Sequence, residues 1–375
     1  MKKIKILLLN VVLVIVSIGA ALTVMELIMP RLNNFSLEEA VYQVRRPVVQ
    51  YLYGEFNPDL RYTLQKGLKD IRLNYPGKLD YTFSTNSEGF RGPEWDMSPE
   101  RRNVLLLGDS FGFGWGVAWE ETVGKLLEKR LQGVDPRYQV VNLAISGYSV
   151  NSVVRSFELY KDRFKPEMVV YVFCPNDLES ISPPLASGGY QIAYKPHPGD
   201  KDAWVALRER NQPGYWSWDK FRRGSYLHAF YARYVRPIIS KRIRASLHND
   251  VPPAGFDFPP PMPEVVEPPD TAQSRFLIYC LDRLGQQVDG QLYIIPTSDK
   301  TILVQKDNAQ NLRWVLAKYC RDNKRAHFVD FENVVRRTAD GRKFYFKYDD
   351  HWTVAGHQLA ADMLFDSIFS AGNVD

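Results

Sequence analysis

The chain has 375 residues, of which 45% are hydrophobic and 24% are charged. This composition is that of a folded globular protein, and it excludes wholesale disorder, collagen-like chains and disulfide scaffolds. The 48 lysines and arginines exceed the 43 aspartates and glutamates by five, which is too small an excess over this length to predict a nucleic-acid partner. Three cysteines without metal-like spacing predict no metal site, although a Cys280–Cys320 disulfide would fit an oxidising compartment.

The amino terminus holds the first predicted element. Three lysines among the first five residues precede an apolar run from Ile6 to Met25. Twenty helical residues span roughly 30 Å, the thickness of a bilayer core. No obvious cleavage site follows, so we predict an uncleaved signal anchor over residues 1–30 rather than a cleaved signal peptide. The lysines predict a cytoplasmic amino terminus, and in a bacterium the body would then be periplasmic or extracellular on the inner membrane.

Residues 31–100 contain turn sequences and one alternating stretch, which predict a connector with short strands. From residue 101 onward, continuous apolar runs alternate with helical stripes. Such runs are typical of strands that are buried on both faces. We therefore predict an α/β domain over 101–375, a three-layer parallel sheet with an insertion at 178–271. The predicted strands are 104–107, 138–145, 168–173, 291–296 and 326–331.

Ser110, Gly147 and Asn176 each follow one of the first three predicted strands. The carboxyl ends of parallel strands meet at one edge of the sheet, so these residues are expected to lie together in one crevice. A serine nucleophile placed there needs a base, a group that orients the base, and donors for the oxyanion.

His351, which lies before the last predicted helix, is the candidate base, and Asp349 or Asp350 is its candidate orienting acid. The candidate oxyanion donors are the backbone N–H groups of Ser110 and Gly147 and the side-chain amide of Asn176.

Four segments resemble the blocks of the SGNH (GDSL-type) hydrolase family. They are Gly108-Asp-Ser-Phe111, Asn142-Leu-Ala-Ile-Ser-Gly147, Pro175-Asn-Asp177 and Asp349-Asp-His-Trp352. The resemblance implies a flavodoxin-like fold without a cofactor or metal. It also implies a Ser110 nucleophile, a His351 base, and Gly147 and Asn176 in the oxyanion hole. The last block has the D-x-H-W form of membrane-anchored relatives, which favours Asp349 over Asp350 as the acid.

Three nearby residues have simpler interpretations. His357 is expected to be a structural helix residue rather than a second base. Asp109 is expected to hold the nucleophile loop, and Cys174 to be a small buried residue beside the site.

The insertion is rich in aromatic and basic residues. We consider Trp216, Trp218, Arg222 and Arg223 candidates for substrate binding, because aromatic rings stack on sugars and arginines meet anionic groups. A surface helix with a solvated basic face explains the same composition equally well.

Together these features predict a membrane-anchored serine esterase that acts on O-acyl groups, foremost O-acetyl, of an envelope or exported carbohydrate. A polysaccharide O-acetyltransferase would use the same Ser-His-Asp site with a sugar acceptor. A third option is a non-catalytic polysaccharide-assembly protein. The expected partners are the acylated carbohydrate or another ester, the membrane, and a polysaccharide-export or acyl-transfer membrane protein.

Overall fold

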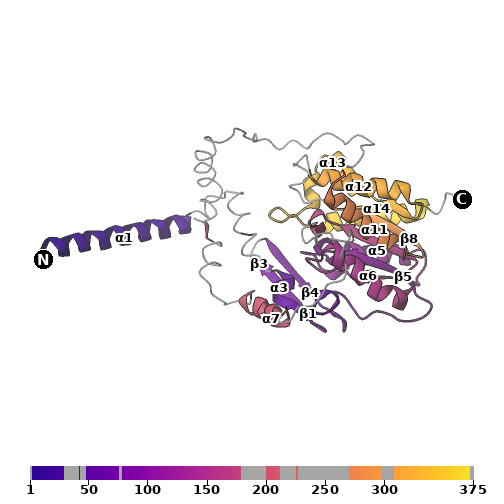
Figure 1. Cartoon of the computed structure of the whole chain (residues 1–375), viewed down its shortest axis with the longest axis horizontal. Coiled ribbons are helices and arrows are strands. Elements are labelled where there is room, and N and C mark those ends of the chain that lie inside the picture. The colour runs from indigo at the N-terminus through magenta and orange to yellow at the C-terminus, as the bar shows by residue number, and fades with distance from the viewer. Residues whose placement is uncertain are drawn as a thin grey trace. The chain divides into compact units, whose positions relative to one another are not determined.

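The computed structural model describes residues 2–28, 42, 48–75, 78–178, 200–211, 225–226, 270–297 and 308–371 (Figure 1). The chain divides into two compact units. One comprises residues 1–46 and 213–255, and the other comprises residues 47–212 and 256–375.

The first unit contains helix α1 (Lys2–Ile28). Its stretch from Asn10 to Ile28 has a mean hydropathy of 2.6, is unburied, and is long and apolar enough to cross a membrane. The predicted apolar helix is therefore confirmed, with the length of a signal anchor or transmembrane span. Near its end, the Glu26 carboxylate accepts hydrogen bonds from the Ser225 hydroxyl (3.0 Å) and the Tyr226 N–H (2.8 Å).

The second unit is built on a five-stranded sheet in the order β6-β5-β7-β8-β9, in which all neighbouring strands are parallel. This arrangement confirms the predicted α/β fold. The first strand of the sheet, β5, lies between β6 and β7, so the direction of winding reverses at β5 and β7. Ligands of such sheets bind beyond the carboxyl ends of the strands at this switch point. The strands are β5 (Arg102–Gly108), β6 (Tyr138–Asn142), β7 (Met168–Phe173), β8 (Gln291–Pro296) and β9 (Ala326–Phe328).

Helices cover both faces of this sheet (Figure 1). On one face, α5 (Val123–Gln132), α13 (Phe331–Arg337) and α14 (Val354–Ala371) contribute to one buried cluster with the strands. On the other, α11 (Ala272–Gly285) contacts both α6 (Val150–Phe164) and α12 (Asn308–Asp322). Further helical segments among the described residues are α4 (Ser110–Phe113), α7 (Asp200–Asn211) and the 3-10 turns Trp119–Glu121, Pro175–Leu178 and Gly341–Phe344.

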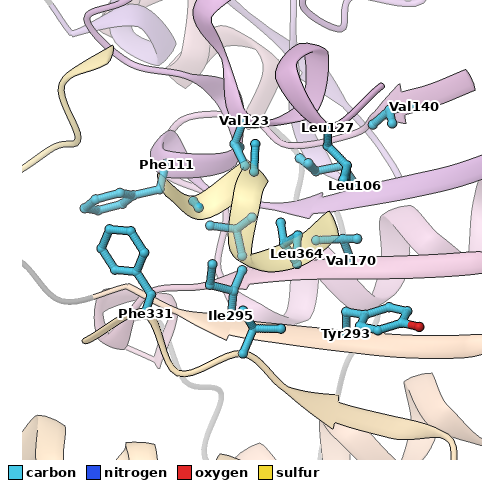
Figure 2. Close-up of a cluster of buried hydrophobic side chains, with 14 of the residues drawn as sticks. Leu106, Phe111, Val123, Leu127, Val140, Val170, Tyr293, Ile295, Phe331 and Leu364 are labelled. Atoms are coloured by element: carbon cyan, nitrogen blue, oxygen red, sulfur yellow. The ribbon is translucent and has the colours of Figure 1, made fainter. Parts of the chain in front are cut away.

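The buried cluster shows why the strand sequences are so apolar. Figure 2 shows Leu106 and Val170 of the sheet beside Val123 and Leu127 of α5 and Leu364 of α14. Leu106 and Val170 are fully buried. Because alternate residues of a strand face opposite sides, a strand covered on both faces must be apolar throughout.

The segment before the sheet contains the predicted short strands. It begins with α3 (Val49–Tyr53) and continues as two antiparallel pairs. Side chains of this segment pack on the loop that follows β5: the Tyr81 and Trp115 rings lie 5.8 Å apart, as do those of Phe83 and Phe113. The strand pairs are β1 (Gly54–Asn57) with β2 (Arg61–Leu64), and β3 (Ile71–Tyr75) with β4 (Leu79–Phe83).

Two predicted strands are too long at their carboxyl ends. The strand predicted to end at Ile145 ends at Asn142, whose side-chain oxygen accepts a hydrogen bond from the Ala144 N–H (2.9 Å) and turns the chain. The strand predicted to end at Phe331 ends at Phe328, because Asp330 caps helix α13 by accepting from the Asn333 N–H (3.3 Å). Buried loop and helix residues are as apolar as buried strand residues, so the pattern alone does not show these ends.

We predict that Leu106→Ala lowers the free energy of unfolding of the sheet unit by about 2–5 kcal/mol, because it removes buried methyl groups and leaves a cavity. Denaturant titration of the detergent-solubilised chain measures this change. Leu159→Ala on the exposed side of α6 is the matched control, since Leu159 is 37% exposed, and it should cost less than about 1 kcal/mol. Equal losses in the two variants would contradict the assigned core.

Candidate active site

Ser110 begins the short helix α4 directly after strand β5. Asp109 caps this helix, with its carboxylate accepting from the Phe111 N–H (2.9 Å). The cap role that serine often has is thus taken by its neighbour, and the Ser110 hydroxyl is left to point toward other groups. That hydroxyl lies 2.7 Å from His351 Nε2 and 3.2 Å from Asp109 Oδ2.

His351 connects Ser110 to a carboxylate 239 positions further along the chain, Asp349. His351 Nδ1 is hydrogen-bonded to Asp349 Oδ1, which also accepts from the backbone N–H of His351 (3.1 Å). A carboxylate only accepts hydrogen bonds, so Nδ1 carries the proton and Nε2 is left as the acceptor for the Ser110 hydroxyl. The three side chains thus form one hydrogen-bonded chain in the order Ser110, His351, Asp349.

Asp349 is the acid that contacts the imidazole, and Asp350 is not. Asp349 is 2% exposed, and its second oxygen accepts from the Trp115 indole N–H (3.2 Å). A buried carboxylate without donors would be costly, and here the indole, an imidazole N–H and a backbone N–H supply them.

Gly147 and Asn176 follow β6 and β7, the two strands that pair with β5, so they flank the position of Ser110. Gly147 has φ = +84°, and a β-carbon there would lie 2.8 Å from Gln50 Nε2 and 2.9 Å from Tyr62 Oη, so glycine is required. Within the described residues, no hydrogen bond engages the Gly147 N–H or the Asn176 side-chain amide. Both donors are therefore available to an oxyanion; their roles remain predictions.

Two carboxyl groups near Ser110, those of Asp109 and Asp177, are buried. Burial raises the pKa of Asp109 above its usual range, against the opposing effect of the Phe111 N–H. Burial also raises the pKa of Asp177 well above its usual range, and the charge of Asp109 adds to this effect. Asp177 Oδ2 accepts from the Tyr171 hydroxyl (2.7 Å) and the Cys174 N–H (3.2 Å). These contacts tie Asp177 to the end of β7 and Asp109 to the nucleophile turn.

Cys174 itself is buried at the end of β7, and burial raises the pKa of its thiol well above the usual range. This environment is that of a structural cysteine rather than a nucleophile. All three cysteines are free thiols, so the structure contains no Cys280–Cys320 disulfide. Among the described residues, no group of His, Cys, Asp and Glu side chains could hold a metal ion.

His357 lies in α14 away from the nucleophile. Its Nδ1 accepts a hydrogen bond from the Val123 N–H at the start of α5 (3.2 Å), and its ring contacts the Trp352 ring edge-on. Burial lowers the pKa of His357 to about 3, and the nearby charges of Arg91 and His351 contribute in the same direction. The residue therefore stays neutral and joins two helices, in keeping with its expected structural role.

Sequence reasoning missed two residues that adjoin the site. Trp115 contacts the acid, and the Tyr62 hydroxyl donates to the Ser146 carbonyl beside Gly147 (2.8 Å). The glycines around Trp115 predict a sharp loop, but no local pattern indicates which carboxylate accepts a hydrogen bond from the indole. Trp216, Trp218, Arg222 and Arg223, proposed for substrate binding, lie outside the described residues.

A doubly wound parallel sheet with a serine, a histidine and an aspartate hydrogen-bonded at its carboxyl edge defines a serine-hydrolase type of protein. The model of the GDSL-like Lipase/Acylhydrolase family matches residues 106–359, more than half of the chain. The chain belongs to this hydrolase family, which confirms the resemblance seen in its sequence. No curated protein matches the chain.

Solved structures of similar fold include those of TesA, of a lipase/acylhydrolase from Enterococcus faecalis, and of a catalytic mutant of Axe2, an acetylxylan esterase from Geobacillus stearothermophilus. Their identities to this chain are 12%, 12% and 13%, with TM-scores of 0.40, 0.38 and 0.38. The matches cover 72%, 73% and 71% of this chain and 99%, 97% and 94% of the others.

The neutral, buried His357 predicts a dependence of stability on pH. Its folded pKa of about 3 lies below the ordinary value of 6.5, so the unfolded chain binds a proton more readily between these values. This contribution to stability is complete above pH 6.5 and falls by up to about 1.4 kcal/mol per pH unit as the pH drops toward 3.

Denaturant titrations of the wild type and His357→Gln at pH 7.5 and 4.5 test this expectation. The stability difference between the two proteins should shrink by about 2 kcal/mol at the lower pH, because only the wild type pays the cost of protonating the buried ring. His327→Gln is the control and should show a smaller change, since His327 is only half-buried. A difference that stays constant with pH would contradict a neutral His357.

Proposed function

We propose that the protein is a membrane-anchored serine esterase that removes O-acyl groups, foremost O-acetyl, from an envelope or exported carbohydrate. The observation that carries the catalytic part is the hydrogen-bonded chain Ser110–His351–Asp349. Membership of an acylhydrolase family supports the same chemistry.

In the first half of the reaction, Ser110 Oγ attacks the ester carbonyl while its proton passes to His351 Nε2. The resulting imidazolium is stabilised by Asp349 through Nδ1, and the oxyanion accepts from the N–H groups of Ser110 and Gly147 and the amide of Asn176. The alkoxy leaving group departs with the proton from Nε2, and the acyl group stays on Ser110. In the second half, water attacks this ester with His351 again as base, releasing the acid and restoring the hydroxyl.

The cellular setting and the carbohydrate rest on other features. The apolar helix Asn10–Ile28 supports anchoring in the cytoplasmic membrane, and the lysines before it support a periplasmic or extracellular body. The aromatic and basic composition of the insertion supports binding of a sugar chain with anionic groups. A sugar hydroxyl in place of water would make the same site an O-acetyltransferase, whose partners would include an acyl-supplying membrane protein.

Mass spectrometry of the detergent-solubilised chain after brief exposure to p-nitrophenyl acetate tests this function. We expect an acetyl adduct on Ser110 and turnover that falls on the order of a thousandfold or more in Ser110→Ala. Free acetate in the presence of a sugar oligomer identifies an esterase, and acetyl on the oligomer identifies a transferase. Undiminished turnover in Ser110→Ala would refute the assigned nucleophile, and no turnover at all would favour a non-catalytic role.

The acid is tested separately with two adjacent carboxamide variants. Asp349→Asn should lower kcat by about 10²–10⁴-fold, because an amide in contact with Nδ1 no longer fixes the tautomer or stabilises the imidazolium. Asp350→Asn is the matched control and should stay within about threefold of wild type, because the carboxylate hydrogen-bonded to Nδ1 is that of Asp349. If Asp350→Asn had the larger effect, the assignment of Asp349 would be wrong.

A further inference from the structure

Arg91 is an unusual residue, because it is an arginine that is only 1% exposed and lies between the strand pairs and the site. Within the described part of the chain it forms no ion pair with a carboxylate. Burying a guanidinium without a counter-ion costs free energy, which hydrogen bonds to strong acceptors offset. Among the described residues, the two Nη groups of Arg91 find such acceptors and its Nε–H does not. Burial lowers its pKa to about 10, which still leaves it charged at neutral pH.

The acceptors are backbone carbonyls, and most of them belong to one loop. Arg91 Nη1 donates to the carbonyls of Phe113 (3.1 Å) and Gly114 (2.5 Å). Its Nη2 donates to the Val117 carbonyl (2.6 Å) and, more weakly, to that of Thr82 (3.3 Å). The guanidinium therefore binds carbonyls of residues 113–117 on both sides of Trp115, the residue that contacts Asp349.

This loop needs an external clamp because its own sequence favours mobility. Gly114 has φ = +82°, and a β-carbon there would lie 2.3 Å from Thr122 Cγ2, so the position must be glycine. Glycine loses more conformational freedom on ordering than any other residue. The charged, planar guanidinium of Arg91 binds three carbonyls of the loop at once. These hydrogen bonds offset the loss of conformational entropy more than a single neutral hydrogen bond would.

Trp115 links the loop to Asp349, so the position of the loop determines the position of the carboxylate. The Trp115 ring is 2% exposed, its indole N–H donates to Asp349 Oδ2 (3.2 Å), and its centroid lies 5.6 Å from that of the His351 ring. One carboxylate oxygen is thus held by the indole and the other by the imidazole. With both oxygens fixed, the carboxylate cannot rotate about its bond to Cβ without losing a hydrogen bond.

We propose that Arg91 and Trp115 are positioning residues: Arg91 holds the 113–117 loop so that the Trp115 indole fixes the Asp349 carboxylate, and through it the His351 ring, for proton transfer from Ser110. This inference rests on the proposed function of the Ser110 site. Neither side chain donates a hydrogen bond to the Ser110 hydroxyl or to the His351 ring, so the effect of the indole N–H is on kcat and acts through Asp349.

Trp115→Phe removes the indole N–H and keeps an aromatic ring in the loop. In the detergent-solubilised full chain, we expect kcat for p-nitrophenyl acetate to fall about tenfold with KM within about twofold, since loss of a hydrogen bond to a charged group typically has this effect. Trp95→Phe is the matched control, because Trp95 packs on Phe90 and Phe164 away from the triad, and it should retain wild-type kcat.

A double-mutant cycle separates positioning from a general structural role. In an Asp349→Ala background, Trp115→Phe should change the rate of Ser110 acetylation by less than twofold, because the group it acts through is gone. Equal losses in both backgrounds, or a single variant within twofold of wild type, would overturn the proposal. Wild-type turnover that does not depend on Ser110 would instead refute the proposed function itself, and it would be seen before any Trp115 variant is made.

Arg91→Lys tests the contact between Arg91 and the 113–117 loop. Lysine keeps the positive charge but cannot hold carbonyls on both sides of Trp115 with one planar group. We expect it to lower kcat in the same direction, and the Arg91→Lys/Trp115→Phe double variant to fall no more than about twofold below the worse single variant. Multiplication of the two losses would show that the residues act independently. Thermal unfolding of each variant identifies any that fail to fold, in which case the Trp115→Phe cycle decides the question alone.

Discussion

The buried carboxylate of Asp349 needs hydrogen-bond donors, and the residues around the site are arranged to supply them. A carboxylate at 2% exposure is tolerable only when its oxygens are met by donors. Here the donors come from three separate places: the side chain and the backbone of His351, and the indole of Trp115. The same contacts that satisfy the charge also set the tautomer of His351. One set of hydrogen bonds therefore offsets the cost of desolvating Asp349 and also orients the His351 ring.

The parallel sheet explains why distant residues can meet this constraint. Strand β5 is hydrogen-bonded to β6 on one side and β7 on the other, so the turns after all three lie at one edge. The apolar strand sequences make this arrangement predictable, and they predict that Ser110, Gly147 and Asn176 lie at this edge. His351 is predictable in a different way, as a histidine with two neighbouring aspartates, and the choice of Asp349 over Asp350 follows from the resemblance of the D-x-H-W block to the family. The contact between the two groups of residues follows from the fold and not from either pattern.

What the sequence did not reveal are side-chain contacts, to backbone or to other side chains, that no local pattern indicates. Every residue has a backbone carbonyl, so an arginine that binds carbonyls has no characteristic partner residue in the sequence. Arg91 therefore looks like any other arginine of a surface segment. The indole of Trp115 likewise meets a carboxylate 234 positions away. The ends of strands β6 and β9 were missed for a related reason: Asn142 and Asp330 stop them through side-chain hydrogen bonds within otherwise apolar stretches.

The segment before the sheet has more than a connecting role in this molecule. Tyr62, from strand β2, donates to the Ser146 carbonyl, and the Tyr148 hydroxyl donates back to the Tyr62 carbonyl (2.9 Å), which ties the strand to the turn that carries Gly147. Arg91, further along the same segment, holds the loop on the Asp349 side. One segment thus contacts both the turn that carries Gly147 and the loop that carries Trp115, although it lies outside the region matched by the family at residues 106–359. Because the proposed oxyanion donor and general base must be held to within fractions of an ångström, we expect the structural unit that supports the proposed catalysis to begin upstream of the first family motif.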